Sequence, residues 1–403
     1  MANFNPELMR DGEQAVLVLQ GGGALGAYQA GVFEELSDSG IKPDWVAGVS
    51  IGAINAAIIV GNPPERRIER LREFWQLVTS KLIGRLPFDD ASIHEVFNGA
   101  SAFLGSAWGV PGFFKPRLLP PYMAPDGTPK ALSWYDTSDL KATLEKLVDF
   151  DLLNSGKVRL SVGAVQIKSG NAKYFDTSCC KIGPEHIMAS GALPPGLPPI
   201  FIKNEAYWDG GIVSNAPLQV VLDEKPQSDL AVFQVDVFSA SGDMPKTIFD
   251  VYEREKEIRY SSRTRFNTDI FVRERRAQQA VGRLLDRLPP ELQQSEDVEY
   301  LRSLVPRFGT TVMHLIYHKQ TYESSSYDYE FSRLSMEEHW NAGRTAVRRS
   351  LTDPRWIERK IVPGNVMVID HDRPDKKQEM RPGRIELSED EDFISSHKER
   401  VSS

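Results

Sequence analysis

Two glycine-rich turns, spaced one strand-helix-strand unit apart, constrain the fold of this chain most strongly. The first occupies residues 21–26 with the sequence GGGALG, and the second occupies residues 48–52 with the sequence GVSIG. Each turn follows a short apolar run and precedes an apolar segment with helical spacing. Continuous apolar runs that end in glycine are typical of strands buried on both faces of a parallel sheet. The pattern therefore predicts an α/β fold with right-handed crossover connections.

The alternation of strand and helix patterns continues to about residue 245. Short apolar runs predict strands, and apolar residues three or four positions apart predict helices. The expected strands are 15–19, 45–49, 158–165, 174–176 and 230–237, and the expected helices are 27–36, 51–60, 65–77, 140–148 and 184–190. We therefore expect residues 14–245 to form one domain around a central, mostly parallel sheet.

Residues 81–135 interrupt this pattern with prolines, glycines and aromatic residues. The aromatic residues include Phe97, Phe103, Trp108, Phe113, Phe114 and Tyr122. A long apolar loop is often a lid over a binding site, and the alternative is a segment that packs on the main core. We predict a lid-like insertion, and the sequence does not say whether residues 96–123 move.

The chain changes character after about residue 245. Charged stretches with helical spacing predict a mainly helical extension over residues 246–370. The expected helices are 248–259, 274–287, 291–304 and 336–351, and one strand is expected at 311–317. Residues 371–403 are dense in charge and poor in apolar residues, so we expect a flexible tail.

Composition excludes several classes of protein. The 403 residues are 41% hydrophobic and 26% charged, which is ordinary for a globular chain. The net charge of -8 argues against a nucleic-acid partner. No apolar run is long enough for a membrane span, and residues 1–13 lack the pattern of a signal peptide. We expect a cytoplasmic protein that can contact membranes or lipid inclusions peripherally. The sequence does not indicate the oligomeric state.

Ser50 is the candidate nucleophile, because the second turn has the form G-x-S-x-G. This motif places a serine on a sharp strand-to-helix turn, flanked here by Gly48 and Gly52. The first turn supplies several backbone N–H groups nearby, which is the equipment that acyl transfer requires. The motif also points the positive end of a helix dipole at the reacting centre.

A nucleotide-binding site is the competing interpretation of the first turn. Gly21, Gly23 and Gly26 satisfy the dinucleotide pattern G-x-G-x-x-G. That pattern needs an acidic residue at the end of the second strand to hold the ribose. The second strand ends in Ser50 instead, and Asp44 precedes that strand. The lysine of a phosphate-binding P-loop is also missing, so we expect no nucleotide and no other cofactor.

Asp209 is the candidate base. It lies between Trp208 and the glycines Gly210 and Gly211, where partial desolvation would raise the pKa of its carboxyl. The alternative is an Asp-Gly-Gly turn with no catalytic role. The histidines are predicted to be structural or exposed, and they are His94, His186, His314, His318, His339, His371 and His397. No spacing of His, Cys, Asp or Glu resembles a ligand cluster, so no metal site is predicted.

Together these blocks resemble the patatin-like phospholipase family. The resemblance rests on residues 21–26 with Gly31, on residues 48–56, and on residues 209–211 with Asn215 and Pro217. A further block at 189–194, leading to two prolines at 198–199, is similar to the segment between nucleophile and aspartate in that family. The order and spacing of the blocks agree over roughly residues 14–240.

The resemblance implies a three-layer α/β/α fold and a serine–aspartate dyad without a catalytic histidine. Ser50 would attack an ester carbonyl of a lipid or another hydrophobic ester, and Asp209 would take its proton and later activate water. The backbone around Gly21, Gly22, Gly23 and Ala24 would form the oxyanion hole. Residues 14–245 would then be the catalytic domain, and residues 246–370 resemble an extension of unknown function in some bacterial relatives.

Two residues of the first turn depart from the family pattern. Leu25 stands where many relatives carry arginine or lysine, and Gln20 stands where the family has aspartate. Loss of the cation puts a preference for phospholipid in doubt. A catalytically silent scaffold that binds lipid or protein through the same pocket is the alternative to an acyl-ester hydrolase.

Overall fold

A computed structural model describes residues 8–80, 109–224, 227–319 and 330–371, with the backbone alone for 262–267. The chain divides into two units, Met1–Ile369 and Asp370–Ser403. The first part of the expected lid-like insertion, which carries His94, Phe97, Phe103 and Trp108, lies outside the described residues. The predicted charged tail also lies outside them, apart from His371.

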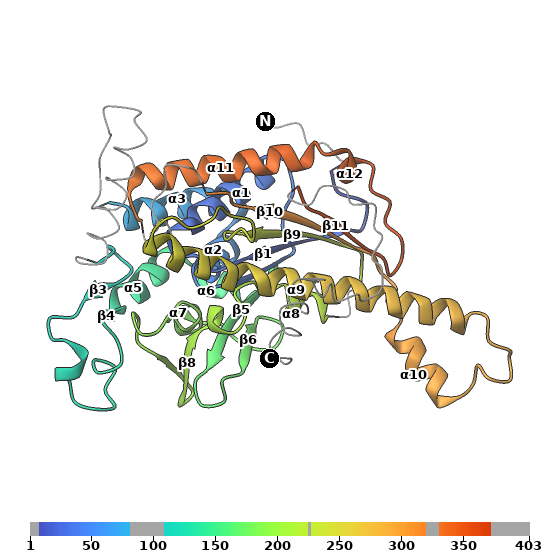
Figure 1. Ribbon diagram of the computed structural model, residues 1–403, viewed down its shortest axis with the longest axis horizontal. Helices are drawn as coiled ribbons and strands as arrows, with labels where there is room; N and C mark the ends of the chain where they lie inside the picture. The colour runs from blue at the N-terminus through green and yellow to red at the C-terminus, as the bar shows by residue number, and fades with distance from the viewer. Residues whose placement is uncertain (1–7, 81–108, 225–226, 320–329, 372–403) are drawn as a thin grey trace, which may run out of the picture. The chain divides into compact units, whose positions relative to one another are not determined.

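A nine-stranded sheet forms the centre of the described first unit (Figure 1). Its order is β11-β10-β9-β1-β2-β5-β8-β7, with β6 also paired to β5. From β11 to β5 every neighbouring pair is parallel, whereas β6, β7 and β8 pair antiparallel. The strands are β1 (Gln14–Leu19), β2 (Trp45–Val49), β5 (Arg159–Gln166), β6 (Ala172–Asp176), β7 (Ile200–Ile202), β8 (Glu205–Asp209), β9 (Leu230–Asp236), β10 (Thr310–Ile316) and β11 (Val366–Ile369).

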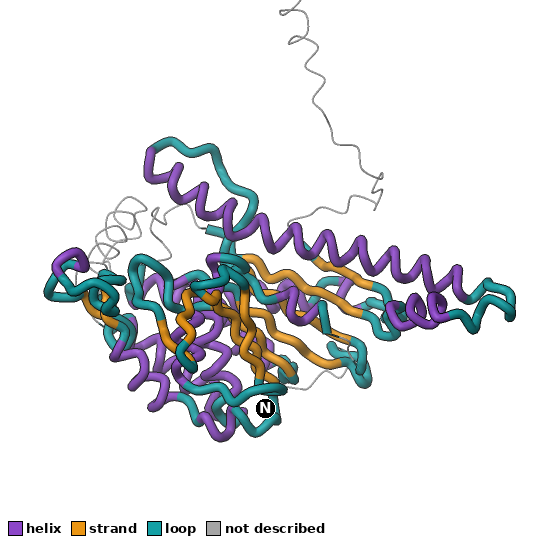
Figure 2. The backbone as a smooth tube through the Cα atoms, turned by 90° about the horizontal axis from the view of Figure 1, so that it is seen from below, coloured by secondary structure: helices purple, strands orange, loops and turns teal. Residues whose placement is uncertain are grey.

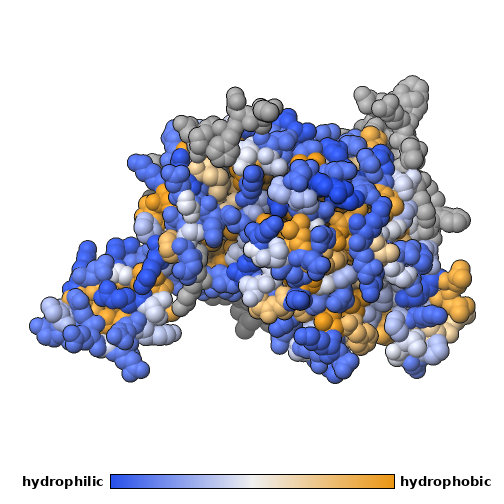
Figure 3. All heavy atoms as spheres, turned by 180° about the vertical axis from the view of Figure 1, so that it is seen from behind, coloured by the Kyte–Doolittle hydropathy of each residue, from blue (hydrophilic) through white to orange (hydrophobic). Residues whose placement is uncertain are grey.

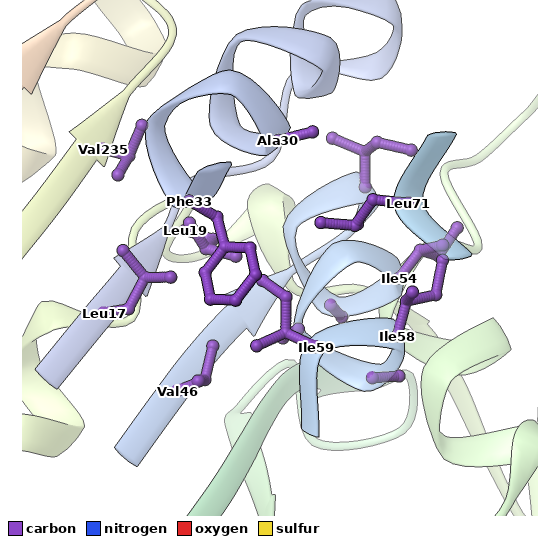
Figure 4. Close-up of a cluster of buried hydrophobic side chains, with 14 of the residues drawn as sticks. Leu17, Leu19, Ala30, Phe33, Val46, Ile54, Ile58, Ile59, Leu71 and Val235 are labelled. Atoms are coloured by element: carbon purple, nitrogen blue, oxygen red, sulfur yellow. The ribbon is translucent and has the colours of Figure 1, made fainter. Parts of the chain in front are cut away.

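Helices cover both faces of this sheet (Figure 2). Alternate residues of β1 enter different apolar clusters: Leu17 and Leu19 face one cluster, and Val16 and Val18 face the other. Figure 4 shows the first cluster, where helices pack on Leu17 and Leu19. That face is covered by α1 (Gly26–Asp38), α2 (Ile51–Val60), α3 (Arg67–Val78), α5 (Ser138–Leu147), α7 (Pro184–Ser190), α11 (Arg333–Leu351) and α12 (Pro354–Ile357). The second face is covered by α8 (Leu218–Leu222) and α9 (Ile248–Leu285). The three-layer α/β/α fold with a mostly parallel sheet is confirmed.

Short elements complete the described chain. They are β3 (Lys115–Pro116), β4 (Tyr135–Asp136), α6 (Phe150–Leu153), α10 (Glu296–Leu304) and the 3-10 turns η1 (Gly23–Leu25), η2 (Pro64–Arg66), η3 (Pro121–Met123) and η4 (Gly210–Ile212). None of the helices in the described ranges combines the length and the apolar character needed to cross a bilayer.

The segment after residue 245 is mainly helical, as predicted, and it also extends the sheet. The strand expected at 311–317 is β10, which lies parallel to β9. The stretches expected to be helical at 248–259 and 274–287 both lie in α9, and the helix also continues between them, from Ile248 to Leu285. No proline or glycine interrupts residues 260–273, and Phe271 packs in the second apolar cluster. Burial therefore sustains the helix through a stretch of weak local propensity.

Helices α1 and α11 pack backbone against backbone. A Cβ on Gly343 would lie 2.1 Å from the Tyr28 carbonyl oxygen, and a Cβ on Gly31 would lie 1.9 Å from the Trp340 carbonyl oxygen. Ion pairs flank this crossing, including Arg344 Nε to Glu35 Oε2 at 2.9 Å. The extension is therefore bound to the first helix of the chain by contacts that leave no space for a side chain.

Gly343→Ala is expected to destabilise the protein, because the added methyl group must push the two helices apart. Overpacking of this kind costs about 1–3 kcal/mol in the free energy of unfolding, which urea unfolding would measure. Asn341→Ala, at an exposed position of the same helix, is the control and should change stability by less than about 0.5 kcal/mol. Equal stability of Gly343→Ala and wild type would contradict the close approach.

Candidate functional site

Ser50 lies on the sharp turn between β2 and α2, with φ 57° and ψ −125°. Positive φ is strained for serine, and surrounding contacts must hold it. A Cβ on Gly52 would lie 2.4 Å from the Leu19 carbonyl oxygen, so the turn closes only with glycine there. The Ser50 N–H donates to Ser190 Oγ at 2.9 Å, and Ser190 Oγ donates to the Gly163 carbonyl at 2.5 Å. These bonds fix the serine at the carboxyl edge of the sheet.

The first glycine turn lies beside Ser50 and is held from the other side by Asn215. The Gly21 N–H donates to the Asn215 carbonyl at 3.0 Å, and Asn215 Nδ2 donates to the Gly21 carbonyl at 2.8 Å. The Gly21 N–H is therefore already engaged. The 3-10 turn η1 begins at Gly23, and the first N–H groups of a helical turn have no acceptor within it. The N–H group at Gly23, the first residue of η1, is thus a candidate donor, and Gly22 directly precedes it.

The register of the sheet brings Asp209 close to Ser50. Val49 of β2 is paired with Gly163 of β5, and the next residue, Ala164, is paired with Asp209 of β8. Asp209 is 2% exposed, and its Oδ1 accepts the Gly211 N–H at 2.7 Å. Burial raises the pKa of Asp209 to about 6, although hydrogen bonds from the Ser50 side chain and from the Gly211 N–H act to lower it. The carboxylate is thus more basic than an exposed aspartate.

A cavity of about 390 Å³ contains both side chains. Among the predicted site residues, it is lined by Gly21, Gly22, Gly23, Ser50, Asp209 and Gly211. The other predicted residues, Ala24, Gly48, Gly52 and Gly210, are buried within or behind the turns. The remaining lining residues are Phe113, Phe114, Tyr135, Gly191, Leu193, Pro194, Pro195, Gly196, Leu197, Asn215, Phe238, Lys256, Tyr260 and Phe331. Most of this wall is apolar or aromatic, which suits a hydrocarbon chain.

Lys256, Tyr260 and Phe331 are among the lining residues that sequence reasoning missed. All belong to the segment after residue 245, to which the sequence assigned no chemistry. No local motif marks them, because they reach the cavity only through the packing of α9 and of the residues before α11.

None of the described residues that line this cavity is a histidine. His186 lies in α7, where its Nδ1 accepts the Gly183 N–H at 2.9 Å and burial lowers its pKa. His339 in α11 stacks edge-on against Tyr317. A second cavity, of about 540 Å³, lies between α8, α9 and the residues after α10, and it contains none of the predicted site residues.

Comparison with known proteins identifies the family. Residues 17–222, just over half of the chain, match the sequence model of the patatin-like phospholipases. The chain belongs to the patatin-like phospholipase family. A second family model, described as patatin phospholipase, matches residues 258–361. Both the domain that carries Ser50 and the segment that carries α9 are therefore patatin-like.

Individual relatives of this patatin-like chain are distant. It is 26% identical over 242 residues to lysophospholipase NTE1 of Yarrowia lipolytica, a match that covers 59% of this chain and 14% of that protein. Among solved structures, VipD from Legionella pneumophila gives a TM-score of 0.38 at 14% identity, covering 84% of this chain and 67% of VipD. The type III effector ExoU gives a TM-score of 0.30 at 13% identity, covering 87% and 55%. At these TM-scores, no residue role and no activity of VipD or ExoU can be assigned to this chain.

The raised pKa of Asp209 is expected to make stability depend on pH. The folded protein holds this proton up to about pH 6, whereas the unfolded chain releases it near its ordinary value of 3.8. The free energy of unfolding is therefore highest at low pH with respect to this group. It falls by about 3 kcal/mol as the pH rises from below 3.8 to above about 6. Asp209→Asn lacks this loss, so its stability relative to wild type should rise by most of that amount, about 2 kcal/mol, between about pH 4 and pH 7.

Urea unfolding of both proteins across this range measures the difference, and other titrating groups cancel between them. Parallel stability profiles for wild type and Asp209→Asn would contradict the raised pKa.

Proposed function

We propose that this protein is a serine acyl-ester hydrolase that cleaves lipid or other hydrophobic esters through Ser50 and Asp209. The observation that carries the proposal is one apolar cavity that contains a serine on a strained turn, a buried carboxylate of raised pKa and the start of a glycine-rich helical turn. Membership of the patatin-like phospholipase family supports the same reaction class.

The first half of the proposed reaction transfers the acyl group to the enzyme. Ser50 Oγ attacks the ester carbonyl carbon while its proton passes to the carboxylate of Asp209. The N–H groups at Gly22 and Gly23 stabilise the negative charge on the carbonyl oxygen, and one such donor is worth about 3 kcal/mol in the transition state. The intermediate then expels the alcohol, which takes the proton from Asp209 and leaves an acyl ester on Ser50.

The second half releases the acid. A water molecule gives a proton to Asp209 and attacks the acyl carbonyl carbon. The bond to Ser50 Oγ breaks, and the serine regains its proton from Asp209 as the carboxylic acid departs. A pKa of about 6 suits both steps, because the carboxylate is mostly ionised at neutral pH and still basic enough to take a proton.

The surface near the cavity supports a hydrophobic substrate and peripheral contact with lipid. The segment between β3 and β4 exposes Leu118, Tyr122 and Met123, and the adjoining Phe114 and Tyr135 line the cavity. Apolar patches of this kind interrupt an otherwise mostly hydrophilic surface (Figure 3). A cytoplasmic location and contact with membranes or lipid inclusions belong to this proposal.

Ser50→Ala and Asp209→Asn are each expected to reduce hydrolysis of short p-nitrophenyl esters by about 10⁴-fold, because each removes a group that moves in the reaction. Asp126→Asn, at an exposed position, is the matched control and should retain full activity. Folding of each variant is checked by circular dichroism. Full activity of either site variant would remove that residue from the mechanism.

Labelling with a fluorophosphonate probe distinguishes the serine hydrolase from the catalytically silent scaffold. Folded wild-type protein is expected to be labelled at Ser50, since the probe reacts with an activated serine. Peptide mass spectrometry locates the label, and Ser50→Ala is the control. Folded protein that resists the probe would favour the scaffold.

Esterase activity is expected to rise with pH around the pKa of Asp209. The base must be ionised, so kcat/KM should fall about tenfold for each pH unit below about 6 and level off above about 7. Initial rates of a neutral ester across this range measure the profile. A midpoint near 4 would show that the Asp209 carboxyl is not desolvated.

A further inference from the structure

The second cavity, of about 540 Å³, is separate from the one that contains Ser50, and no described residue lines both. Helix α10 folds back beside the second half of α9 (Figure 1). The walls come from the end of α8, from this half of α9, and from the end of α10 with residues 305–308. The volume is within the range of cavities that hold small organic ligands. The fold therefore contains a ligand-sized space that the proposed hydrolysis does not use.

One part of the wall of this second cavity is apolar and buried. Leu222 at the end of α8 is 4% exposed, and Phe271 of α9 is 5% exposed. Val305 and Phe308, which precede β10, are half-buried and line the same cavity. A ligand with a hydrocarbon group can remove that group from water by contact with these side chains.

Arg275 adds a partly desolvated charge to this apolar wall. Its side chain is half-buried, its guanidinium carbon lies 4.8 Å from the centre of the Phe271 ring, and burial lowers its pKa. Its Nη1 donates to Gln278 Oε1 at 3.5 Å, which is long for a hydrogen bond. Glu274 acts on it only through space, and no carboxylate of the described residues forms an ion pair with it. A guanidinium has five N–H donors, so most of them are left for a ligand.

The balance of charge in the cavity favours an anion. Glu224 accepts from Arg159 Nη2 at 2.6 Å, so its charge is compensated from outside the cavity. Three cations then remain against two carboxylates. Within the described ranges, no group of three His, Cys, Asp or Glu side chains is placed to hold a metal ion. The charged residues that line the cavity are Asp223, Glu224, Glu274, Arg275, Arg302 and Arg307.

We propose that this cavity is a second binding site, which takes a small organic carboxylate with an apolar tail, of which a medium-chain fatty acid is the simplest. The carboxylate accepts two parallel hydrogen bonds from the Arg275 guanidinium, and the tail lies against Phe271 and Leu222. Guanidinium and carboxylate match in shape, and such charge-assisted pairs are stronger than neutral hydrogen bonds. Binding here needs neither Ser50 nor Asp209, so the proposal does not rest on the proposed hydrolysis.

Equilibrium binding of octanoate to the full chain tests this site, with octanamide as a neutral probe of the same length. Calorimetry should show wild type binding octanoate about tenfold more tightly than octanamide. Arg275→Met is expected to weaken octanoate binding about tenfold and to change octanamide binding less than about twofold. Arg275→Lys should give an intermediate affinity for octanoate, because an ammonium keeps the charge but loses the two parallel donors. Octanoate held in the catalytic cavity would not respond, because Arg275 does not line that cavity.

Arg273→Met is the matched control, because it makes the same substitution at an exposed position of the same helix, outside the cavity. It should leave the binding of both probes unchanged, and circular dichroism checks the folding of each variant. Unchanged octanoate binding in Arg275→Met, or equal weakening of both probes, would overturn the proposal. If Arg275→Met does not fold, the wild type decides, since octanoate binding no tighter than octanamide also overturns it.

Two competitors identify the source of the carboxylate. N-acetyl-leucyl-phenylalanine presents a carboxylate at the end of a peptide, and inorganic phosphate is an anion without an apolar tail. Both are expected to displace octanoate only at concentrations well above that of octanoate itself. Displacement by less of the peptide would assign the site to the end of a protein chain, and displacement by less phosphate would assign it to phosphate. Either result would overturn the fatty acid.

Discussion

The close approach of α2 to the end of β1 is the constraint on which the site depends. Gly52 lies against the Leu19 carbonyl with no space for a side chain, and this contact allows Ser50 to adopt its positive φ at the edge of the sheet. Because Leu19 ends β1, the same contact sets the first glycine turn beside the serine. One backbone contact thus positions a candidate nucleophile and candidate oxyanion donors together.

The rest of the fold holds that contact in place. Strands β10 and β11 continue the sheet beyond β9, and α11 crosses α1 at Gly31 and Gly343. Near the start of the described chain, Glu13 forms a fully buried ion pair with Arg359 at 2.6 Å. Removing one partner of such a pair leaves a buried charge unpaired. The first and last parts of the described first unit therefore support each other, and the segment after residue 245 belongs to the core.

Local signals explain why much of the candidate site could be predicted from the sequence. Ser50 and Asp209 each sit in a turn whose glycines are readable in isolation, and the apolar runs before them indicate strands. Their proximity follows from sheet register, which the order of the strands alone does not specify. Lys256 had no such signal, because a lysine on a charged helix resembles any solvated residue. The continuity of α9 was missed for a related reason, since burial of Phe271 outweighs local propensity.

The order of the chain has a consequence for biosynthesis. Ser50 and Asp209 both leave the ribosome before α9, α11 and the strand that covers the free edge of β9. A nascent chain that ends near residue 245 already carries Ser50 and Asp209, but one wall of the cavity is missing and β9 is an uncovered edge. The wall formed by Lys256, Tyr260 and Phe331 is added only after residue 331 has been made, so the cavity forms later than the two turns that hold Ser50 and Asp209.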